Sequence, residues 1–122
     1  MSNALGIIIE DDDALSDIYE EALRSVGFEP EVIANGRIAL NRLKEIVPDL
    51  ILLDLHLPEV NGQAVLQYIK NETRFNKTIV VITTADPILA EKMRGEADFV
   101  LLKPIGFLQL RDLATRLLAA DA

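Results

Sequence analysis

The chain contains no cysteine and no tryptophan, and basic side chains are scarce. The absence of cysteine excludes disulfides, thiolate metal sites and a cysteine nucleophile. Twelve Lys and Arg residues stand against twenty Asp and Glu residues, which gives a net charge of −8. Because nucleic-acid phosphates and anionic lipids attract basic surfaces, we expect this chain to contact neither nucleic acid nor a membrane directly.

Long hydrophobic runs are also missing. No apolar stretch approaches the roughly 20 residues needed to cross a bilayer, and residues 1–5 lack the basic and apolar parts of a signal peptide. Together with the lack of cysteine, this predicts a cytoplasmic protein. The length of 122 residues predicts a single domain over residues 1–122, large enough to bury a core without disulfides.

Half of the residues are hydrophobic but only 5% are aromatic, so the core should be aliphatic. The apolar runs of strand length are Leu5–Ile9, Glu31–Ala34, Leu50–Leu53, Thr78–Ile82 and Phe99–Leu102. Each run is followed by a segment whose apolar residues lie three and four positions apart, the spacing of a helix. Strands that alternate with helices in this way predict a doubly wound α/β fold around a parallel sheet.

Cap and turn residues suggest where the predicted helices begin and end. The first should span residues 13–26, with Asp13 as its N-cap and Gly27 as its C-terminal cap. The second helix should lie between the turn Asn35-Gly36 and Pro48, and it should include Ile46 and Val47. The third should follow Asn61-Gly62, a short fourth should span Pro87–Met93, and the fifth should start near Phe107.

Polar side chains follow the predicted strands at the points where the strands end. Glu10 and Asp11 follow the first strand, Asp54 the third and Lys103 the fifth, and Thr84 lies just beyond the fourth. Right-handed crossovers bring these strand ends to one edge of a parallel sheet, where such folds bind ligands. We therefore expect three carboxylates, a hydroxyl and an ammonium group to gather there.

Clustered carboxylates repel one another unless a cation lies between them. Carboxylates and carbonyls are the ligands of Mg²⁺ (or Mn²⁺), and no cysteine and only one histidine are present to favour zinc. Asp54 can bind this metal and also act as a carboxylate nucleophile that forms an aspartyl phosphate. Asp12 and Asp13 are interpreted instead as acids that stabilise a helix start.

The chain resembles the receiver domains of response regulators in bacterial two-component signalling. The resemblance rests on IIIEDDDAL (Ile7–Leu15), LILLDLHLPEVNG (Leu50–Gly62), VVITTAD (Val80–Asp86) and LLKPIG (Leu101–Gly106), and it covers essentially the whole chain. It implies a flavodoxin-like, CheY-like (βα)5 sandwich with a five-stranded parallel sheet of order 2-1-3-4-5. It also implies a single receiver domain over residues 1–122. Because the sequence ends at Ala122, just after the last predicted helix, we expect no attached output domain.

The resemblance further implies a role for each residue of the site. By position these are Asp54 as phosphoacceptor, Glu10, Asp11, Asp54 and the backbone carbonyl of His56 as metal ligands, Thr84 as switch hydroxyl, and Lys103 as phosphate-sensing lysine. The phosphoryl donor would be a histidine kinase or a phosphotransfer protein, and the signal would pass to an unknown downstream protein. The resemblance also allows two copies of the chain to form a homodimer. The domain would catalyse only its own phosphorylation and dephosphorylation, and it would not be an enzyme with a separate substrate.

Two departures from the family pattern concern switching. The family usually has an aromatic residue three positions before the lysine, where this chain has Val100, and the neighbouring Phe99 faces the opposite way in an extended strand. The segment from Thr84 to Lys103 is also shorter than usual, so the fourth helix should be stunted. These departures favour an alternative function, a receiver fold that binds proteins independently of phosphorylation.

A second alternative is an aspartyl-phosphate hydrolase of the haloacid-dehalogenase type. Such enzymes carry an Asp two positions after the nucleophile as general acid and base. Here that position is His56, so we do not favour this alternative. The side chains of His56 and Asp86, each two residues after a site residue, are interpreted as groups that could tune water access to a phosphorylated Asp54.

Overall fold

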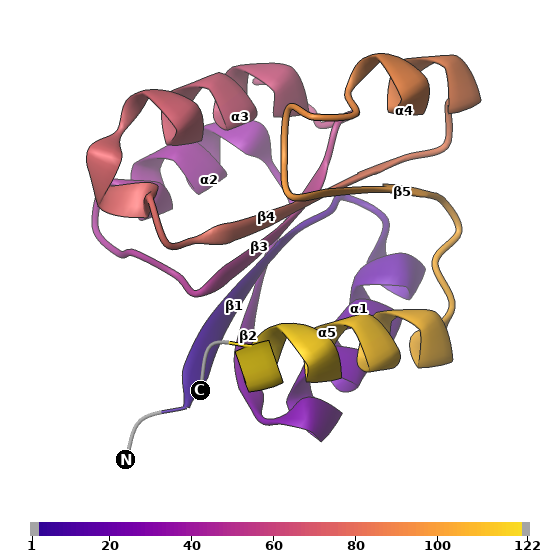
Figure 1. The fold of residues 1–122 in the computed structure, drawn as a ribbon. Helices are drawn as coiled ribbons and strands as arrows, with labels where there is room; N and C mark the ends of the chain where they lie inside the picture. The colour runs from indigo at the N-terminus through magenta and orange to yellow at the C-terminus, as the bar shows by residue number, and fades with distance from the viewer. Residues whose placement is uncertain (1–2, 121–122) are drawn as a thin grey trace.

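A computed structural model describes residues 3–120, which form a single five-stranded parallel sheet of order β2-β1-β3-β4-β5 flanked by helices (Figure 1). The strands are β1 (Ala4–Ile9), β2 (Phe28–Ile33), β3 (Leu50–Asp54), β4 (Ile79–Thr84) and β5 (Phe99–Leu102). The helices are α1 (Asp13–Val26), α2 (Gly36–Leu43), α3 (Gly62–Asn71), α4 (Pro87–Lys92) and α5 (Phe107–Ala120), with a short 3₁₀ helix, η1 (Thr73–Phe75). The doubly wound fold and the strand order predicted above are confirmed.

The sheet is covered on both faces, with α1 and α5 on one side and α2, α3 and α4 on the other (Figure 1). All five residues of β3 are buried, and they alternate between the two layers. Ile51 and Leu53 pack with the core under α2 and α3, whereas Leu50 and Leu52 pack with the core under α1 and α5. A strand buried on both faces has no polar alternation, which is why its sequence is a continuous apolar run.

The first helix has the predicted range, but its N-cap is Asp12 and the predicted cap Asp13 is wrong. Asp12 has extended backbone angles, and its carboxylate accepts a hydrogen bond from the backbone N–H of Leu15 at 2.9 Å. Asp13 is already the first helical residue, where its negative charge favours the N-terminal end of the helix dipole. Gly27 ends the helix in the left-handed conformation with φ 115°, as predicted.

Several other boundaries differ from the sequence prediction. Those of β1, β3, β4 and α4 differ by only one or two residues, and those of β2 and α2 differ more. Strand β2 begins at Phe28 rather than Glu31, and it ends before Ala34. The earlier start is possible because β2 is an edge strand and tolerates Pro30, which pairs with Gly6 of β1. Helix α2 ends at Leu43, so Ile46 and Val47 lie outside it. The helical spacing of these two residues was misleading.

The fourth helix is short, as the sequence predicts, and covers only Pro87–Lys92. In β5, Val100 packs with the core on the α2 and α3 side, while Phe99 is 38% exposed. The position that carries an aromatic side chain in the family pattern therefore holds a half-buried valine. Ile88 and Leu102, on α4 and β5, are also exposed apolar residues.

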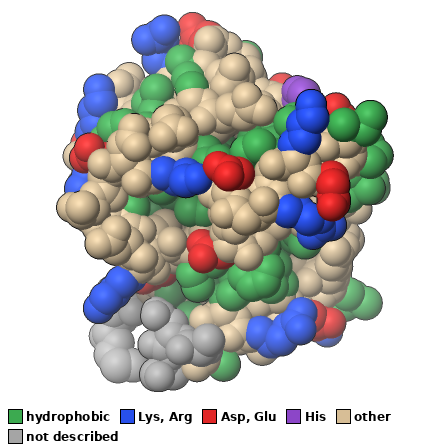
Figure 2. Space-filling view, turned by 45° about the horizontal axis from the view of Figure 1, so that its top comes forward, with side chains coloured by type: hydrophobic (Ala, Val, Ile, Leu, Met, Phe, Trp, Pro, Cys, Tyr) green, Lys and Arg blue, Asp and Glu red, His purple; other side chains and the backbone are tan. Residues whose placement is uncertain are grey.

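No helix within residues 3–120 combines the length and the apolar character that a membrane crossing requires. On the face shown in Figure 2, basic side chains lie in small separate groups, several of them beside acidic side chains. Among residues 3–120, ion pairs such as Lys70–Glu96 and Arg94–Glu91, both at 2.8 Å, join partly or fully exposed side chains of opposite charge. The basic charge on this face is thus dispersed and partly neutralised.

Candidate functional site

The predicted site residues meet at the carboxyl ends of the strands. Glu10 directly follows β1, Asp54 is the last residue of β3, and Lys103 directly follows β5. Strands β1 and β3 are neighbours in the sheet, although β2 comes between them in the chain. The strand order therefore reverses between β1 and β3, and doubly wound sheets bind ligands at this point.

Three carboxylates form a compact acidic cluster at this edge. One oxygen of each of Glu10, Asp11 and Asp54 lies within 4.8 Å of the others. Glu10 and Asp54 are only 2% exposed, whereas Asp11 is exposed to solvent. Two buried carboxylates and one exposed carboxylate would leave a bound cation reachable from solvent.

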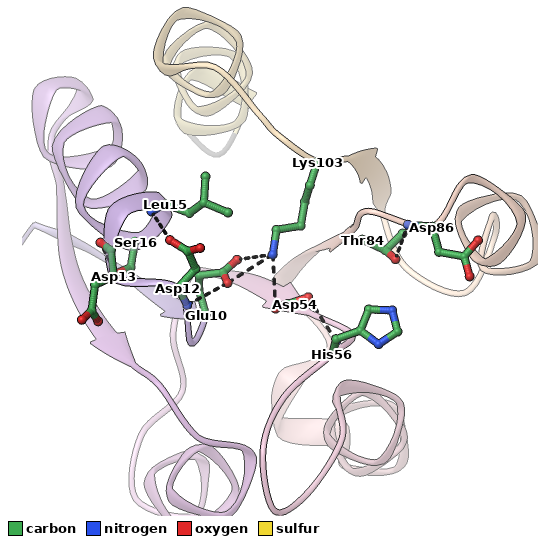
Figure 3. A network of polar contacts seen from close by, with 10 residues as sticks. All are labelled: Glu10, Asp12, Asp13, Leu15, Ser16, Asp54, His56, Thr84, Asp86 and Lys103. Carbon is green, nitrogen blue, oxygen red and sulfur yellow. Dashed lines mark hydrogen bonds and ion pairs between the residues drawn. The ribbon is translucent and has the colours of Figure 1, made fainter.

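Lys103 lies between the two buried carboxylates (Figure 3). Its Nζ atom is 2.9 Å from Glu10 Oε1, 3.2 Å from Glu10 Oε2 and 3.3 Å from Asp54 Oδ2. The sequence predicts that the ammonium faces the acids, and the structure adds that one ammonium bridges two carboxylates. This bridge neutralises the mutual repulsion of two negative charges in a buried environment.

Burial and the ion pair have opposite effects on the pKa values of Glu10 and Lys103. Burial raises the pKa of Glu10, while the hydrogen bond from Lys103 lowers it in part. Burial also lowers the pKa of Lys103, but the hydrogen bond to Glu10 and the charge of Asp54 outweigh this effect, so its pKa is raised. The lysine is therefore held in its charged form.

The residues present suit a hard divalent cation. Glu10 Oε1 is buried and receives no hydrogen bond, since its contact with Lys103 lacks the geometry of one. The ion pair with Lys103 leaves this oxygen able to accept a further partner, and a cation between it and the oxygens of Asp11 and Asp54 would supply one. This donor set consists of oxygen atoms alone, which favours Mg²⁺ or Mn²⁺.

The loop after β3 orients the Asp54 side chain. The backbone N–H of His56 donates a hydrogen bond to Asp54 Oδ1 at 3.1 Å, so both carboxylate oxygens have a partner. The imidazole of His56 is exposed and points away from Glu10 and Lys103 (Figure 3). At Gly62 a Cβ atom would lie 2.2 Å from the carbonyl oxygen of Asp54, so only glycine allows α3 to start this close to the site.

Thr84 ends β4 and is fully buried, and its neighbour Thr83 pairs with Asp54 in the sheet register. The hydroxyl oxygen of Thr84 accepts a hydrogen bond from the backbone N–H of Asp86 at 3.1 Å (Figure 3). Asp86 also caps α4 through hydrogen bonds from the N–H groups of Ile88 and Leu89. The Asp86 side chain thus has a structural role in starting α4.

The sequence indicated every residue of this cluster, but it did not indicate how Lys103 is shared between two acids. The ion pair between Lys103 and Glu10 joins residues 93 positions apart. The rule that strand ends meet at one edge places both residues there, but it does not decide which carboxylate the lysine contacts. This detail depends on side-chain geometry.

Comparisons with known proteins agree with the fold and extend over most of the chain. The model of the family described as "Response regulator receiver domain" matches residues 7–115. A DNA-binding response regulator MtrA of Mycolicibacterium paratuberculosis is 34% identical over 102 residues, which cover 80% of this chain and 44% of that protein. The chain thus spans less than half the length of this curated relative.

Solved structures resemble the whole domain. The signal receiver domain of a signal transduction histidine kinase from Syntrophus aciditrophicus is 28% identical, with a TM-score of 0.83, over 96% of this chain and 91% of that one. The receiver domain of the sensor histidine kinase PA1611 from Pseudomonas aeruginosa, with a magnesium ion coordinated in its active-site cleft, has a TM-score of 0.84 at 21% identity, covering 97% and 99% of the two chains.

Proposed function

The chain belongs to the response regulator receiver domain family of two-component signalling, and from this we propose that Asp54 accepts a phosphoryl group with the help of a divalent cation. The observation that carries the proposal is the pair of buried carboxylates, Glu10 and Asp54, at the tips of adjacent strands with Lys103 between them. The magnesium ion in the cleft of the PA1611 receiver domain supports a cation at the corresponding edge of the sheet.

Asp54 would act as the nucleophile. One of its carboxylate oxygens forms the new O–P bond while the P–N bond of a phosphohistidine donor breaks, and the electron pair of that bond returns to the imidazole nitrogen. The hydrogen bond from His56 N–H and the ion pair with Lys103 fix the orientation of the carboxylate before the donor arrives. Such positioning is the main contribution a protein makes to phosphoryl transfer.

Neutralisation of charge is the second requirement. A divalent cation held by Glu10, Asp11, Asp54 and the His56 carbonyl would neutralise the charge that gathers on the phosphoryl oxygens. Lys103 can turn from Glu10 towards one of these oxygens, since its flexible side chain already reaches the edge of the site. The Thr84 hydroxyl already accepts from Asp86 N–H, so its own hydrogen is available to a phosphoryl oxygen.

The proposed partners follow from this chemistry. We propose a histidine kinase or a phosphotransfer protein as donor and a protein as the downstream target, in the cytoplasm. The acidic charge of −8 argues against direct contact of this domain with nucleic acid. Residues 1–122 would form one receiver domain, and the activity of any longer protein is a separate question, because the curated relative extends well beyond the matched region.

Labelling with a small phosphodonor tests the proposed function. Purified protein incubated with acetyl phosphate and Mg²⁺ should gain the mass of one phosphoryl group, measured by intact-protein mass spectrometry. The same protein in excess EDTA should gain none, because no cation then balances the charge on the phosphoryl oxygens as they approach the carboxylates. Folded protein that remains unlabelled in Mg²⁺ would favour the alternative, a phosphorylation-independent interaction module, to which Val100 and the six-residue α4 also point.

The exposed imidazole of His56 suggests a role in controlling dephosphorylation. It lies two residues after Asp54 at the solvent edge of the site, where it can affect the approach of water to a phosphorylated Asp54. We expect His56→Asn to change the rate of dephosphorylation several-fold while Mg²⁺ affinity stays constant, because the backbone carbonyl is retained. An unchanged rate, measured from the decay of the phosphorylated mass, would remove this role.

A further inference from the structure

The loop from Leu55 to Asn61, which carries His56, lies against the N-terminus of α2. The backbone N–H of Gly36 donates a hydrogen bond to the carbonyl oxygen of Pro58 at 3.3 Å. A Cβ atom at Gly36 would lie 1.7 Å from the carbonyl oxygen of Val60, so the two backbones touch only because residue 36 is glycine. The start of α2 and the loop after β3 therefore form one packed unit.

Asn35 joins the two segments through both ends of its side-chain amide. Its Oδ1 atom accepts hydrogen bonds from the N–H groups of Arg37 at 2.8 Å and Ile38 at 3.2 Å, which caps α2. Its Nδ2 atom donates a hydrogen bond to Glu59 Oε2 in the loop. An aspartate would cap the helix equally well, but it has no hydrogen to donate to Glu59.

Glu59 has an unusual backbone conformation at the centre of this loop. Its φ angle is 65°, and the N–H of Val60 donates to the carbonyl oxygen of Pro58 at 2.8 Å across it. This is a γ-turn with a positive central φ, a rare and strained type. Strained backbone of this kind persists only where surrounding contacts hold it, and it is concentrated at functional sites.

We propose that Asn35 and Glu59 form a positioning clasp, which holds the strained turn and thereby sets the place of the His56 carbonyl for cation binding. This inference rests on the proposed function. The base of the loop is fixed by hydrogen bonds from Leu55 N to Thr83 O at 3.1 Å and from Gly62 N to Leu55 O at 3.0 Å. Between these points, the turn is restrained by its contacts with α2 and by the packing of Leu57 and Val60 against the core.

The clasp is tested with variants that separate it from the helix cap. Asn35→Asp keeps the cap but replaces the donor with a charge that repels Glu59. Glu59→Gln is the matched control, because its amide oxygen can still accept from Asn35. The double variant Asn35→Asp/Glu59→Gln exchanges the acid and the amide, so it keeps the net charge of the wild type and can re-form a hydrogen bond in the opposite direction.

Two measurements are made on each variant. Isothermal titration calorimetry gives the Mg²⁺ dissociation constant, and hydrogen exchange of the Val60 amide in metal-free protein reports on the turn itself. We expect Asn35→Asp to weaken Mg²⁺ binding about tenfold, as is typical when a group that orients a metal ligand is lost, and to speed exchange at Val60. An added negative charge alone would strengthen cation binding, so the expected loss has the opposite sign to a simple charge effect.

The double variant should bind Mg²⁺ with the wild-type affinity and show wild-type exchange at Val60, and Glu59→Gln should resemble the wild type. Wild-type affinity in Asn35→Asp, or a loss that the double variant does not restore, would overturn the clasp. A wild-type protein that binds no Mg²⁺ would overturn the proposed function itself, and the positioning role of the clasp would fall with it. The two failures are therefore distinguishable.

Discussion

Asp54→Asn should abolish labelling by acetyl phosphate while leaving the domain folded. Asparagine has the shape of aspartate, and its Oδ1 atom can still accept the hydrogen bond from His56 N–H. It lacks the carboxylate nucleophile, so no acyl phosphate can form. The substitution also removes one of two buried negative charges and leaves Lys103 paired with Glu10. We therefore expect a free energy of unfolding in EDTA equal to or above that of the wild type.

The matched control for this prediction is Asp12→Asn. Asp12 is an exposed acid two residues after Glu10, and its role as the N-cap of α1 is one that asparagine fills equally well. Labelling of Asp12→Asn should therefore match the wild type in intact-protein mass spectra. Persistent labelling of Asp54→Asn would show that another group accepts the phosphoryl, and it would contradict the assignment of Asp54.

Lys103→Met should destabilise the metal-free protein strongly. Methionine fills a similar volume but leaves Glu10 and Asp54, each 2% exposed, without the ammonium that neutralises them. Removing one partner from a buried ion pair typically costs 3–5 kcal/mol, and protonation of a carboxylate can reduce this. We expect the free energy of unfolding in EDTA, measured by denaturant titration, to fall by about 3 kcal/mol.

Magnesium should reverse much of this loss, because a cation takes over the charge that the lysine balanced. The stabilisation by Mg²⁺ should therefore be larger in Lys103→Met than in the wild type, while labelling by acetyl phosphate slows. The control is Lys70→Met, which breaks the Lys70–Glu96 pair on the surface and should cost less than about 1 kcal/mol. Equal stability of Lys103→Met and the wild type in EDTA would contradict the bridging role of the lysine.

The fold was predictable because each buried strand carries a strong local signal. A run such as Leu50–Leu53 has no polar position, and in the structure β3 is buried along its whole length. The weakest prediction was β2, since an edge strand has exposed positions and tolerates Pro30, so its sequence has neither a continuous apolar run nor a clean alternation.

Boundary errors had local causes. Ile46 and Val47 continue the apolar spacing of α2, but the helix ends at Leu43, and Val47 is 51% exposed. Asp12 and Asp13 are adjacent residues of the same type, so residue preference alone does not distinguish a cap from a first helical residue. The hydrogen bond to Leu15 N–H decides between them, and only the structure shows it.

The composition of the site followed from topology, whereas its fine geometry did not. Because the ends of parallel strands meet at one edge, the residues at the carboxyl ends of β1, β3 and β5 had to lie together. The left-handed conformation of Glu59 has no sequence signal, since glutamate rarely adopts it. Its contact with Asn35 joins residues 24 positions apart in two loops, which no periodicity can indicate.

Chemical trapping of the phosphorylated residue tests the central claim most directly. Borohydride reduces an aspartyl phosphate to homoserine, and peptide mass spectrometry then locates the changed residue in the chain. After treatment with acetyl phosphate and Mg²⁺, homoserine should appear at position 54, and it should be absent when EDTA replaces Mg²⁺. Homoserine at another acidic position, or none at all in protein that is folded and loaded with Mg²⁺, would contradict the assignment of Asp54 as the phosphoacceptor.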